Sequence, residues 1–287
     1  MSNLGLWAQM KAASAAGILA GGLPYARNTW YVGENIPQSA LQQRVDSLAN
    51  LFANHLVSGD LVLLGPQAYE EGNLTIPEGV DNVTIMGCGP RGSCFIEAPV
   101  TGDEGLLVLG DGLTLINVGV AGGETGDYSL KVGSATVSPA RFRAYGCKFE
   151  NSVRAVHLHG AGDTILDDCE ICWTTNGMIL QSNNDGFVTQ ARIQRCLLHN
   201  YVTVGIGEAA AAQQCNDLWL IDNVFGRQED GTAGTDDILL SDNLNTGFIT
   251  GNRFPRATNG TGFITIGTGL IYNPNGTEAG WSTARPA

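Results

Sequence analysis

Two adjacent carboxylates are the most enzyme-like residues in this sequence. Asp167 and Asp168 are followed closely by Glu170, and paired carboxylates can supply general acid and base catalysis at a glycosidic bond. Alternation along the surrounding β segment places Asp167 outward and Asp168 at a bend. This pattern favours a turn and a solvated face over a catalytic pair.

Cysteine and histidine residues offer metal or redox chemistry. Cys169 and Cys172 form a C-x-x-C pair, but a zinc site needs two further ligands and a redox pair needs a helix N-terminus. The two cysteines fall on opposite faces of one strand, which favours a core position for Cys169. His157 and His159 are expected to point outward together, where solvation is the commoner state.

Two further motifs are weaker. Asp236, Asp237 and Asp242 lie in a turn-rich loop, whereas Ca²⁺ needs six or more converging oxygens. Gly87–Gly92 matches G-x-G-x-x-G, but a β segment follows it instead of the helix that nucleotide binding requires. We therefore predict no catalytic residue, no metal and no cofactor.

Composition limits the class of protein. The 287 residues include 39 glycines, and only 15% are charged while 43% are hydrophobic. High glycine with few charges disfavours a helical bundle, a coiled coil and a disordered chain. The net charge of −13 argues against nucleic acid and anionic membranes as partners.

Short β segments recur along the chain and must position any site. Seven of them align on one column, at intervals of 30, 29, 22, 27, 27 and 29 residues. The column comprises Cys88, Val118, Cys147, Cys169, Cys196, Asn223 and Asn252. A second apolar column lies three residues earlier, and this odd interval indicates an extra residue at a bend. In six of the seven segments Gly, Asn or Asp stands there, and these residue types tolerate positive φ.

This period predicts an all-β solenoid of stacked parallel coils. An antiparallel sandwich also has many short strands, but it does not need matched residues at a fixed interval. In a solenoid, equivalent residues stack, so the column becomes a structural ladder. Cysteine suits a narrow inward corner, and asparagine can bond to the coils above and below.

The ends of the chain lack the repeat. We expect residues 37–57 to form an amphipathic helix that caps the first coil, with Ser39 as N-cap and apolar residues on one face. The apolar face comprises Leu41, Val45, Leu48, Phe52 and Leu56. The predicted division is a docking arm over 1–36, the helix over 37–57, the solenoid over 58–269 and a tail over 270–287.

One segment carries a family resemblance. Ser58–Ile96 has Gly59-Asp60, a strand, a turn at Gly65–Tyr69 and two further β segments. It resembles the opening coils of right-handed parallel β-helix proteins of the pectate-lyase-like class. The resemblance implies a single-stranded right-handed parallel β-helix, a fold that hosts lyases, hydrolases, adhesins and virion proteins. The terminal segments Asn3–Trp7 and Gly276–Ala287 resemble small β-helix proteins of tailed bacteriophages.

The resemblance also exposes gaps in the chemistry. Pectin hydrolases of this fold pair their aspartates with a later Gly-His-Gly and an Arg-Ile-Lys. Here His157–Gly160 precedes the aspartate pair, and Arg192-Ile193-Gln194 lacks the lysine. A lyase would need an arginine beside its Ca²⁺ carboxylates, and none stands outward next to Asp236 and Asp237.

Outward positions carry several apolar residues. Stacked on neighbouring coils they would form an apolar stripe, which monomers rarely expose. The candidate interface comprises Met86, Ile116, Tyr145, Ile165, Trp219 and Ile221, with Trp7 and Trp281 from the ends. We expect association into a homotrimer of rods, mostly from the phage resemblance.

The predicted function is a non-enzymatic bacteriophage structural protein. It would be a capsid decoration or cement protein located in the virion, with the major capsid protein or another virion protein as partner. The alternative is a tailspike or tail-fibre adhesin that binds or depolymerises a host surface glycan. Its groove would use outward residues such as Asp167, Trp173 and Trp219.

Overall fold

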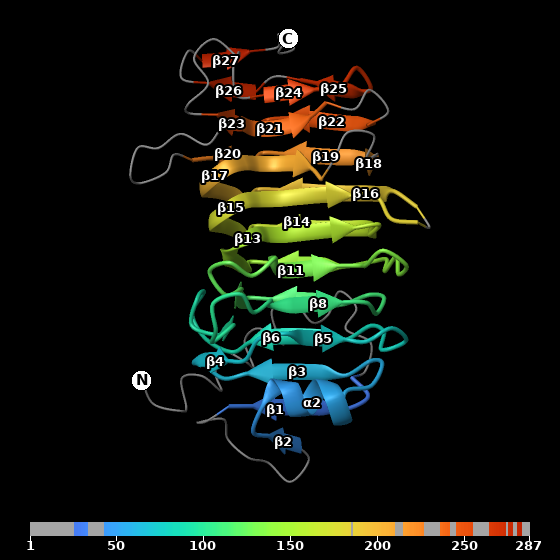
Figure 1. Ribbon diagram of the computed structural model, residues 1–287, viewed down its shortest axis with the longest axis vertical. Helices are drawn as coiled ribbons and strands as arrows, with labels where there is room; N and C mark the ends of the chain where they lie inside the picture. The colour runs from blue at the N-terminus through green and yellow to red at the C-terminus, as the bar shows by residue number, and fades with distance from the viewer. Residues whose placement is uncertain are drawn as a thin grey trace.

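The chain winds into a rod of stacked parallel coils (Figure 1). The computed structural model describes residues 26–33, 43–184, 186–209, 215–226, 236–241, 245–254, 264–273, 275–277 and 280–282. Within those ranges all strand pairs are parallel except β26 (Asn275–Thr277) with β27 (Gly280–Ser282), which are antiparallel. The predicted all-β parallel solenoid is confirmed.

Each coil contributes to three sheet faces, here called A, B and C. Face A contains β1 (Thr29–Val32), β3 (Leu61–Leu64), β6 (Thr84–Gly87), β9 (Thr114–Ile116), β12 (Arg143–Tyr145), β14 (Gly162–Asp167), β16 (Val188–Gln194), β19 (Leu218–Ile221), β22 (Gly247–Thr250) and β25 (Leu270–Tyr272). The short strand β2 (Gln43–Val45) pairs with β1, and β18 (Cys215–Asn216) pairs with β16.

Faces B and C merge in the middle of the rod. Face B contains β4 (Ala68–Glu70), β7 (Phe95–Glu97), β10 (Gly119–Ala121), the first halves of β13 (Lys148–His159), β15 (Glu170–Gln181) and β17 (Leu197–Glu208), then β20 (Val224–Phe225), β23 (Arg253–Phe254) and β26. Face C contains β5 (Leu74–Ile76), β8 (Leu106–Val108), β11 (Tyr128–Val132), the second halves of β13, β15 and β17, then β21 (Asp236–Leu240) and β24 (Ile264–Ile266).

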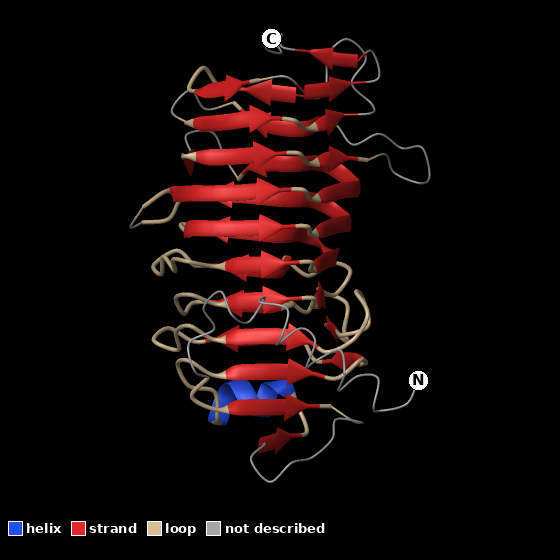
Figure 2. Cartoon of the chain, turned by 180° about the vertical axis from the view of Figure 1, so that it is seen from behind, coloured by secondary structure: helices blue, strands red, loops and turns tan. Residues whose placement is uncertain are grey.

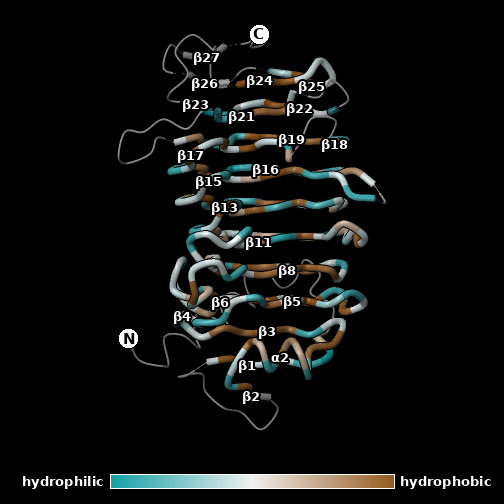
Figure 3. Tube along the Cα trace, viewed as in Figure 1, coloured by the Kyte–Doolittle hydropathy of each residue, from teal (hydrophilic) through white to brown (hydrophobic). Residues whose placement is uncertain are grey.

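Apolar side chains from all three faces fill the inside of the rod. Strand positions alternate inward and outward, as in β12, where Ala144 is buried between the more exposed Arg143 and Tyr145. Apolar segments recur on successive coils in Figure 3, and the buried residues form one continuous cluster from Trp30 to Leu270. The predicted hydrophobic repeat therefore builds a single core.

The bend between faces A and B has positive φ at Asn117, Gly146, Asp168, Arg195, Asp222 and Gly251. All but Arg195 are of the residue types that the sequence analysis predicted there. Gly87 is the exception, since its φ is not positive, and a Cβ there would collide with the backbone oxygen of Asn117. A second column of positive φ, at equivalent positions at or just before the starts of the face A strands, was not predicted. It comprises Gly59, Asn82, Gly112, Arg141, Asp163, Gln190 and Asp217.

The capping helix is shorter than the predicted 37–57 segment. Helix α2 spans Leu48–Asn54, and Ser47 is its N-cap through a 3.1 Å bond from the Asn50 amide. Val45 lies in β2 instead, and Ser39 and Leu41 lie outside the described residues. Leu48, Leu51 and Phe52 are buried, and the helix lies at the N-terminal end of the rod, where it packs against β2 and β5 (Figure 2). The apolar positions of the predicted helix are divided between strand β2 and helix α2. The spacing of apolar residues alone cannot show where a strand ends and a helix begins.

The solenoid also extends further at both ends than the predicted 58–269. Residues 29–32, assigned to a docking arm, form β1 and pair with Leu61–Leu64. Trp30 is buried there, and its indole Nε1 donates a 2.7 Å bond to Asp60. Leu270–Tyr272, assigned to the tail, forms β25 and pairs with β22. No helix among the described ranges is long and apolar enough to cross a membrane.

Candidate functional site

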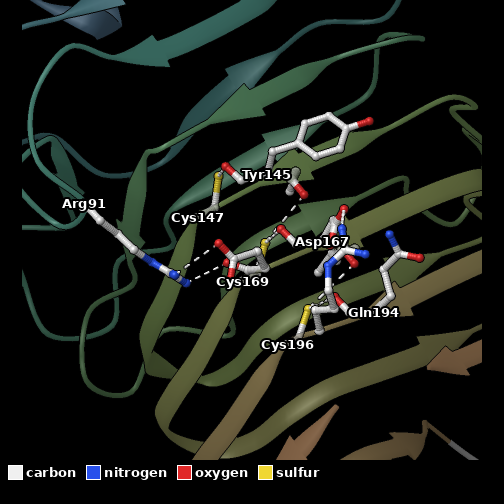
Figure 4. Close-up of polar contacts among 11 residues, drawn as sticks. Arg91, Tyr145, Cys147, Asp167, Cys169, Gln194 and Cys196 are labelled. Atoms are coloured by element: carbon white, nitrogen blue, oxygen red, sulfur yellow. Dashed lines mark hydrogen bonds and ion pairs between the residues drawn. The ribbon is translucent and has the colours of Figure 1, made fainter. Parts of the chain in front are cut away.

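The predicted ladder is a continuous column over the central coils. Cys147, Cys169 and Cys196 follow one another on successive coils, with the outward residues Tyr145, Asp167 and Gln194 two positions before them (Figure 4). The Cys169 thiol donates to the Ala144 and Asp167 carbonyls at 3.5 and 3.4 Å, and burial raises the pKa of Cys147. All seven cysteines are buried free thiols, so this column is packed core and holds no disulfide.

Asparagine continues the column with a different interaction. The backbone amides of Cys196 and Asn223 donate bonds of 2.9 Å to the side-chain oxygens of Asn223 and Asn252 respectively. The Asn223 side-chain amide donates to Asn252 Oδ1 and to the Ile193 carbonyl, each at 2.9 Å. The Asn223 amide thus bonds to the coils on both sides, which satisfies polar groups that would otherwise be costly to bury.

Cys88 lies outside this column. It packs with Tyr31 and Leu63 in a separate small cluster, while Cys94 occupies the core and its thiol bonds to the Leu64 carbonyl at 3.4 Å. The reason is local backbone geometry. Gly87 lacks the positive φ of the other bends, so the residue after it does not turn into the corner.

The outward apolar residues do not form the uninterrupted stripe that was predicted. Met86, Ile116 and Tyr145 stack in register, but Asp167 and Gln194 follow before Ile221 is reached. A second outward column runs through Ile165, Arg192, Trp219, Phe248 and Ile271. Its last three residues are exposed, at 37%, 40% and 51%. Trp7 lies outside the described residues, and so does the side chain of Trp281 in β27.

The paired aspartates form separate ion pairs. Asp167 is outward and pairs with Arg195, and Asp168 is the bend residue and pairs with Arg91 at 3.4 Å. Figure 4 shows Arg91 reaching across to this bend. The two carboxylates are thus engaged by different arginines, in agreement with a structural role for this pair.

The remaining sequence candidates are dispersed. His157 and His159 stack with ring centroids 5.3 Å apart, but they are buried rather than solvated. Burial, with Lys131 and Arg154 nearby, lowers the pKa of His157 to about 3. Asp237 is buried and accepts a hydrogen bond from Tyr201, and Asp242 lies outside the described residues.

Face A carries a hollow that the sequence did not predict. Its volume is about 420 Å³, and its lining comes from β14, β16 and β19 and from the residue before β19. The lining comprises Asp163, Ile165, Gln190, Ala191, Arg192, Asp217 and Trp219. Asp163, Gln190 and Asp217 belong to the second positive-φ column, so one backbone conformation repeated on three coils builds one wall.

The opposite wall combines an aromatic ring with a cation. The Arg192 guanidinium lies over the Trp219 ring, 4.4 Å from its centroid, and Phe248 meets the same ring edge to face at 6.1 Å. Asp163 pairs with Arg143 at 2.7 Å, which fixes its carboxylate at the rim. Apolar ring surface beside fixed hydrogen-bonding groups is the composition of a binding site for a polar ligand with apolar faces.

Comparisons with known proteins define the fold. No protein-family model matches the chain, and no curated protein matches it. Among solved structures, it is similar to pectate lyase Pel9A, with a TM-score of 0.63 and 13% identity over 88% of this chain and 69% of that one. It is also similar to a pectin methylesterase from Aspergillus niger, with a TM-score of 0.52 and 16% identity over 92% and 89%. The right-handed parallel β-helix is thereby shown.

Proposed function

We propose that this protein binds a polysaccharide in the hollow on face A. One observation carries the proposal: three consecutive coils place an aromatic ring, a guanidinium and two carboxylates around one hollow. A polymer lying along the rod would meet the same wall on each coil, about 4.8 Å further on. The two structural neighbours are named for activities on pectic polysaccharides, which supports a glycan ligand without specifying it.

The charge of the chain favours a neutral glycan. The net charge is −13, and Asp163 and Asp217 add carboxylates at the hollow, so a polyanionic chain would be repelled. A neutral sugar can place its apolar ring face on Trp219 or Phe248 and its hydroxyl groups on Gln190 and the carboxylates.

Binding is proposed here without cleavage. Glycoside hydrolysis needs one carboxyl group that donates a proton and a second that activates water or attacks. The Asp163 carboxylate is already occupied by Arg143 at 2.7 Å. The side chains of the hollow therefore suit recognition, and cleavage is measured as a separate outcome of the test.

Affinity electrophoresis tests the proposal with three polymers: dextran, a galactomannan and polygalacturonate. We expect retardation in a neutral polymer and a loss of affinity of at least about tenfold in Trp219→Ala. Trp173→Ala is the control, because Trp173 is also an exposed tryptophan, at 49% against 37% for Trp219, and lies on β15, away from the hollow. Unchanged mobility of the parent protein in all three polymers would reject the proposal. Release of reducing or unsaturated ends would show cleavage in addition.

A second candidate role is structural, in a bacteriophage particle. Trp219, Phe248 and Ile271 stand in register and exposed on three consecutive coils, and such a patch supports burial against another chain. The second copy of a homotrimer or a capsid protein would be that chain. Sedimentation equilibrium should then give a trimer that Phe248→Asp dissociates, and mass spectrometry should detect the protein in purified particles. A monomer that is absent from particles would eliminate this role.

A further inference from the structure

Four donor side chains converge on the outward side of face B, away from the proposed glycan site. They come from the three longest strands, β13, β15 and β17, which are parallel neighbours. Register places Glu150, Cys172 and His199 in one outward column, and Glu170 stands beside Lys148 in the next. Their side chains offer one thiol, one imidazole and two carboxylates.

The donor atoms are close to one another. Cys172 Sγ lies 3.4 Å from Glu150 Oε2 and 3.6 Å from Glu170 Oε1. His199 Nε2 lies 3.1 Å from the same Glu170 oxygen. The Glu170, Cys172 and His199 atoms all lie within 4.8 Å of one another. Zinc bonds of ~2.0–2.3 Å at tetrahedral angles would hold ligand atoms ~3.3–3.7 Å apart, so small adjustments of rotamers are sufficient.

We propose that Glu150, Glu170, Cys172 and His199 bind a divalent transition-metal ion of the zinc class. The donor set identifies the class, because a thiolate and an imidazole suit borderline ions whereas Ca²⁺ and Mg²⁺ take oxygen ligands. The site has an entry path, since the side chains of Glu150, Glu170 and His199 are 20–29% exposed although Cys172 is fully buried.

Lys148 occupies the position of the cation when no metal is bound. Its ammonium lies 2.6 Å from Glu150 Oε2 and 3.9 Å from Glu170 Oε1. Metal binding releases the Cys172 proton to solvent and moves the ammonium outward, where the lysine is already 25% exposed. Two carboxylates and one thiolate then carry three negative charges, which a divalent ion and the Lys148 ammonium balance.

The bound ion would fasten three consecutive coils from outside. Each of the three strands supplies at least one ligand, so unfolding of any of these coils would release the metal. An ion that binds only the folded chain stabilises it by mass action. The consequence is a structural metal that supports the middle of the rod and leaves the hollow on face A unchanged.

Titration with ZnCl₂ and CoCl₂ alone tests the site on chelator-treated full-length protein. We expect one ion per chain by elemental analysis, a raised Tm, and a thiolate-to-cobalt charge-transfer band in the near ultraviolet. Cys172→Ser should abolish that band, and His199→Gln should weaken binding at least about tenfold. Cys88→Ser and Glu97→Gln are matched controls, a buried cysteine elsewhere and a glutamate in the same outward column as Glu150. Both controls should bind like the parent.

Lys148→Met provides an independent test in the opposite direction. Removing the competing ammonium should tighten Zn²⁺ binding about tenfold, a gain that a misfolded variant could not produce. The proposal is overturned if the parent binds less than stoichiometric Zn²⁺ at micromolar concentration, if Cys172→Ser retains the band, or if Lys148→Met binds no more tightly. Each result leaves the glycan assay unaffected, because the two sites lie on different faces.

Discussion

The inward corner between faces A and B and the outward side of face A are built from the same coils, yet they differ in regularity. Inward, Cys147, Cys169 and Cys196 repeat one residue type and Asn223 and Asn252 repeat another. Outward, one column contains an aromatic residue, an acid and an amide in succession, namely Tyr145, Asp167 and Gln194. Stacking neighbours constrain the volume and hydrogen bonds of an inward residue, whereas solvent accepts almost any outward side chain. Binding sites are therefore expected on the irregular side.

The asparagine ladder gives the largest expected effect. Asn223→Ala removes the amide that bonds the coils on both sides, leaves the Cys196 amide without its acceptor and opens a cavity. We expect a loss of about 3 kcal/mol in the free energy of unfolding, measured by urea denaturation. Gln194→Ala, on the outward side, should cost less than about 0.5 kcal/mol. Similar losses at the two positions would remove the distinction between the two sides.

The pH dependence of stability tests His157, an outward strand position that is nevertheless buried. The pKa of His157 is lowered from 6.5 to about 3 by burial and by Lys131 and Arg154. Between pH 6.5 and 3 the unfolded chain therefore binds a proton that the folded chain does not bind. The stabilising contribution of neutral His157 to the free energy of unfolding is fully present above pH 6.5, and it decreases as the pH falls toward 3. Between pH 6.5 and 5 we expect a loss of about 2 kcal/mol. His157→Gln should flatten this profile in urea titrations at several pH values. An equally steep profile in the variant would assign the loss to other groups.

A column comparison also predicts a stabilising substitution. Asn151, Trp173 and Asn200 occupy equivalent positions with φ of 64°, 51° and 54°. Asparagine tolerates this left-handed conformation, and a tryptophan does so at a cost. Trp173→Asn should therefore stabilise the fold by about 0.5–1 kcal/mol in thermal unfolding. The same substitution at Trp219, which lies within a regular strand, should give no gain. A loss at Trp173 would show that its packing outweighs the backbone conformation.

The smallest effect is expected at an exposed ion pair. Arg91 and Asp168 are joined at 3.4 Å with side chains 44% and 68% exposed. Solvent screens such pairs, so Arg91→Ala should change the free energy of unfolding by less than about 0.5 kcal/mol. The change should diminish in 1 M salt. A cost above 1 kcal/mol would mean that the loop of residues 88–94, between β6 and β7, depends on this contact.

The inward pattern was predictable because it repeats. Intervals between cysteines and asparagines gave the coil length, and the bend residues gave the corner between two faces. The prediction that Cys88 belongs to the column was wrong, because Gly87 before it lacks the positive φ expected at the bend. The bounds of helix α2 were predicted too wide and β1 was missed, because a terminal coil has only one neighbour and shows no period.

The outward sites needed a different use of the same alignment. The interval of 27 residues that aligns Cys169 with Cys196 also aligns Cys172 with His199, so the donor cluster on face B was accessible to sequence reasoning, although we did not find it. The hollow on face A was not, because Asp163 and Asp217 line it from positions whose positive φ was not foreseen. Residues of these types occur throughout the chain, and only the backbone shows which ones face a common space.

The last coil of the rod does not end like the others. A stack of parallel coils can be extended indefinitely, because each terminal coil exposes backbone N–H and C=O groups that a further parallel coil could pair with. At β26 and β27 the chain reverses and pairs with itself, and the added rung runs against the direction of all those below it. On face B, a second copy stacked on this end would therefore meet an antiparallel edge strand, and the parallel register of the coils below would not be continued.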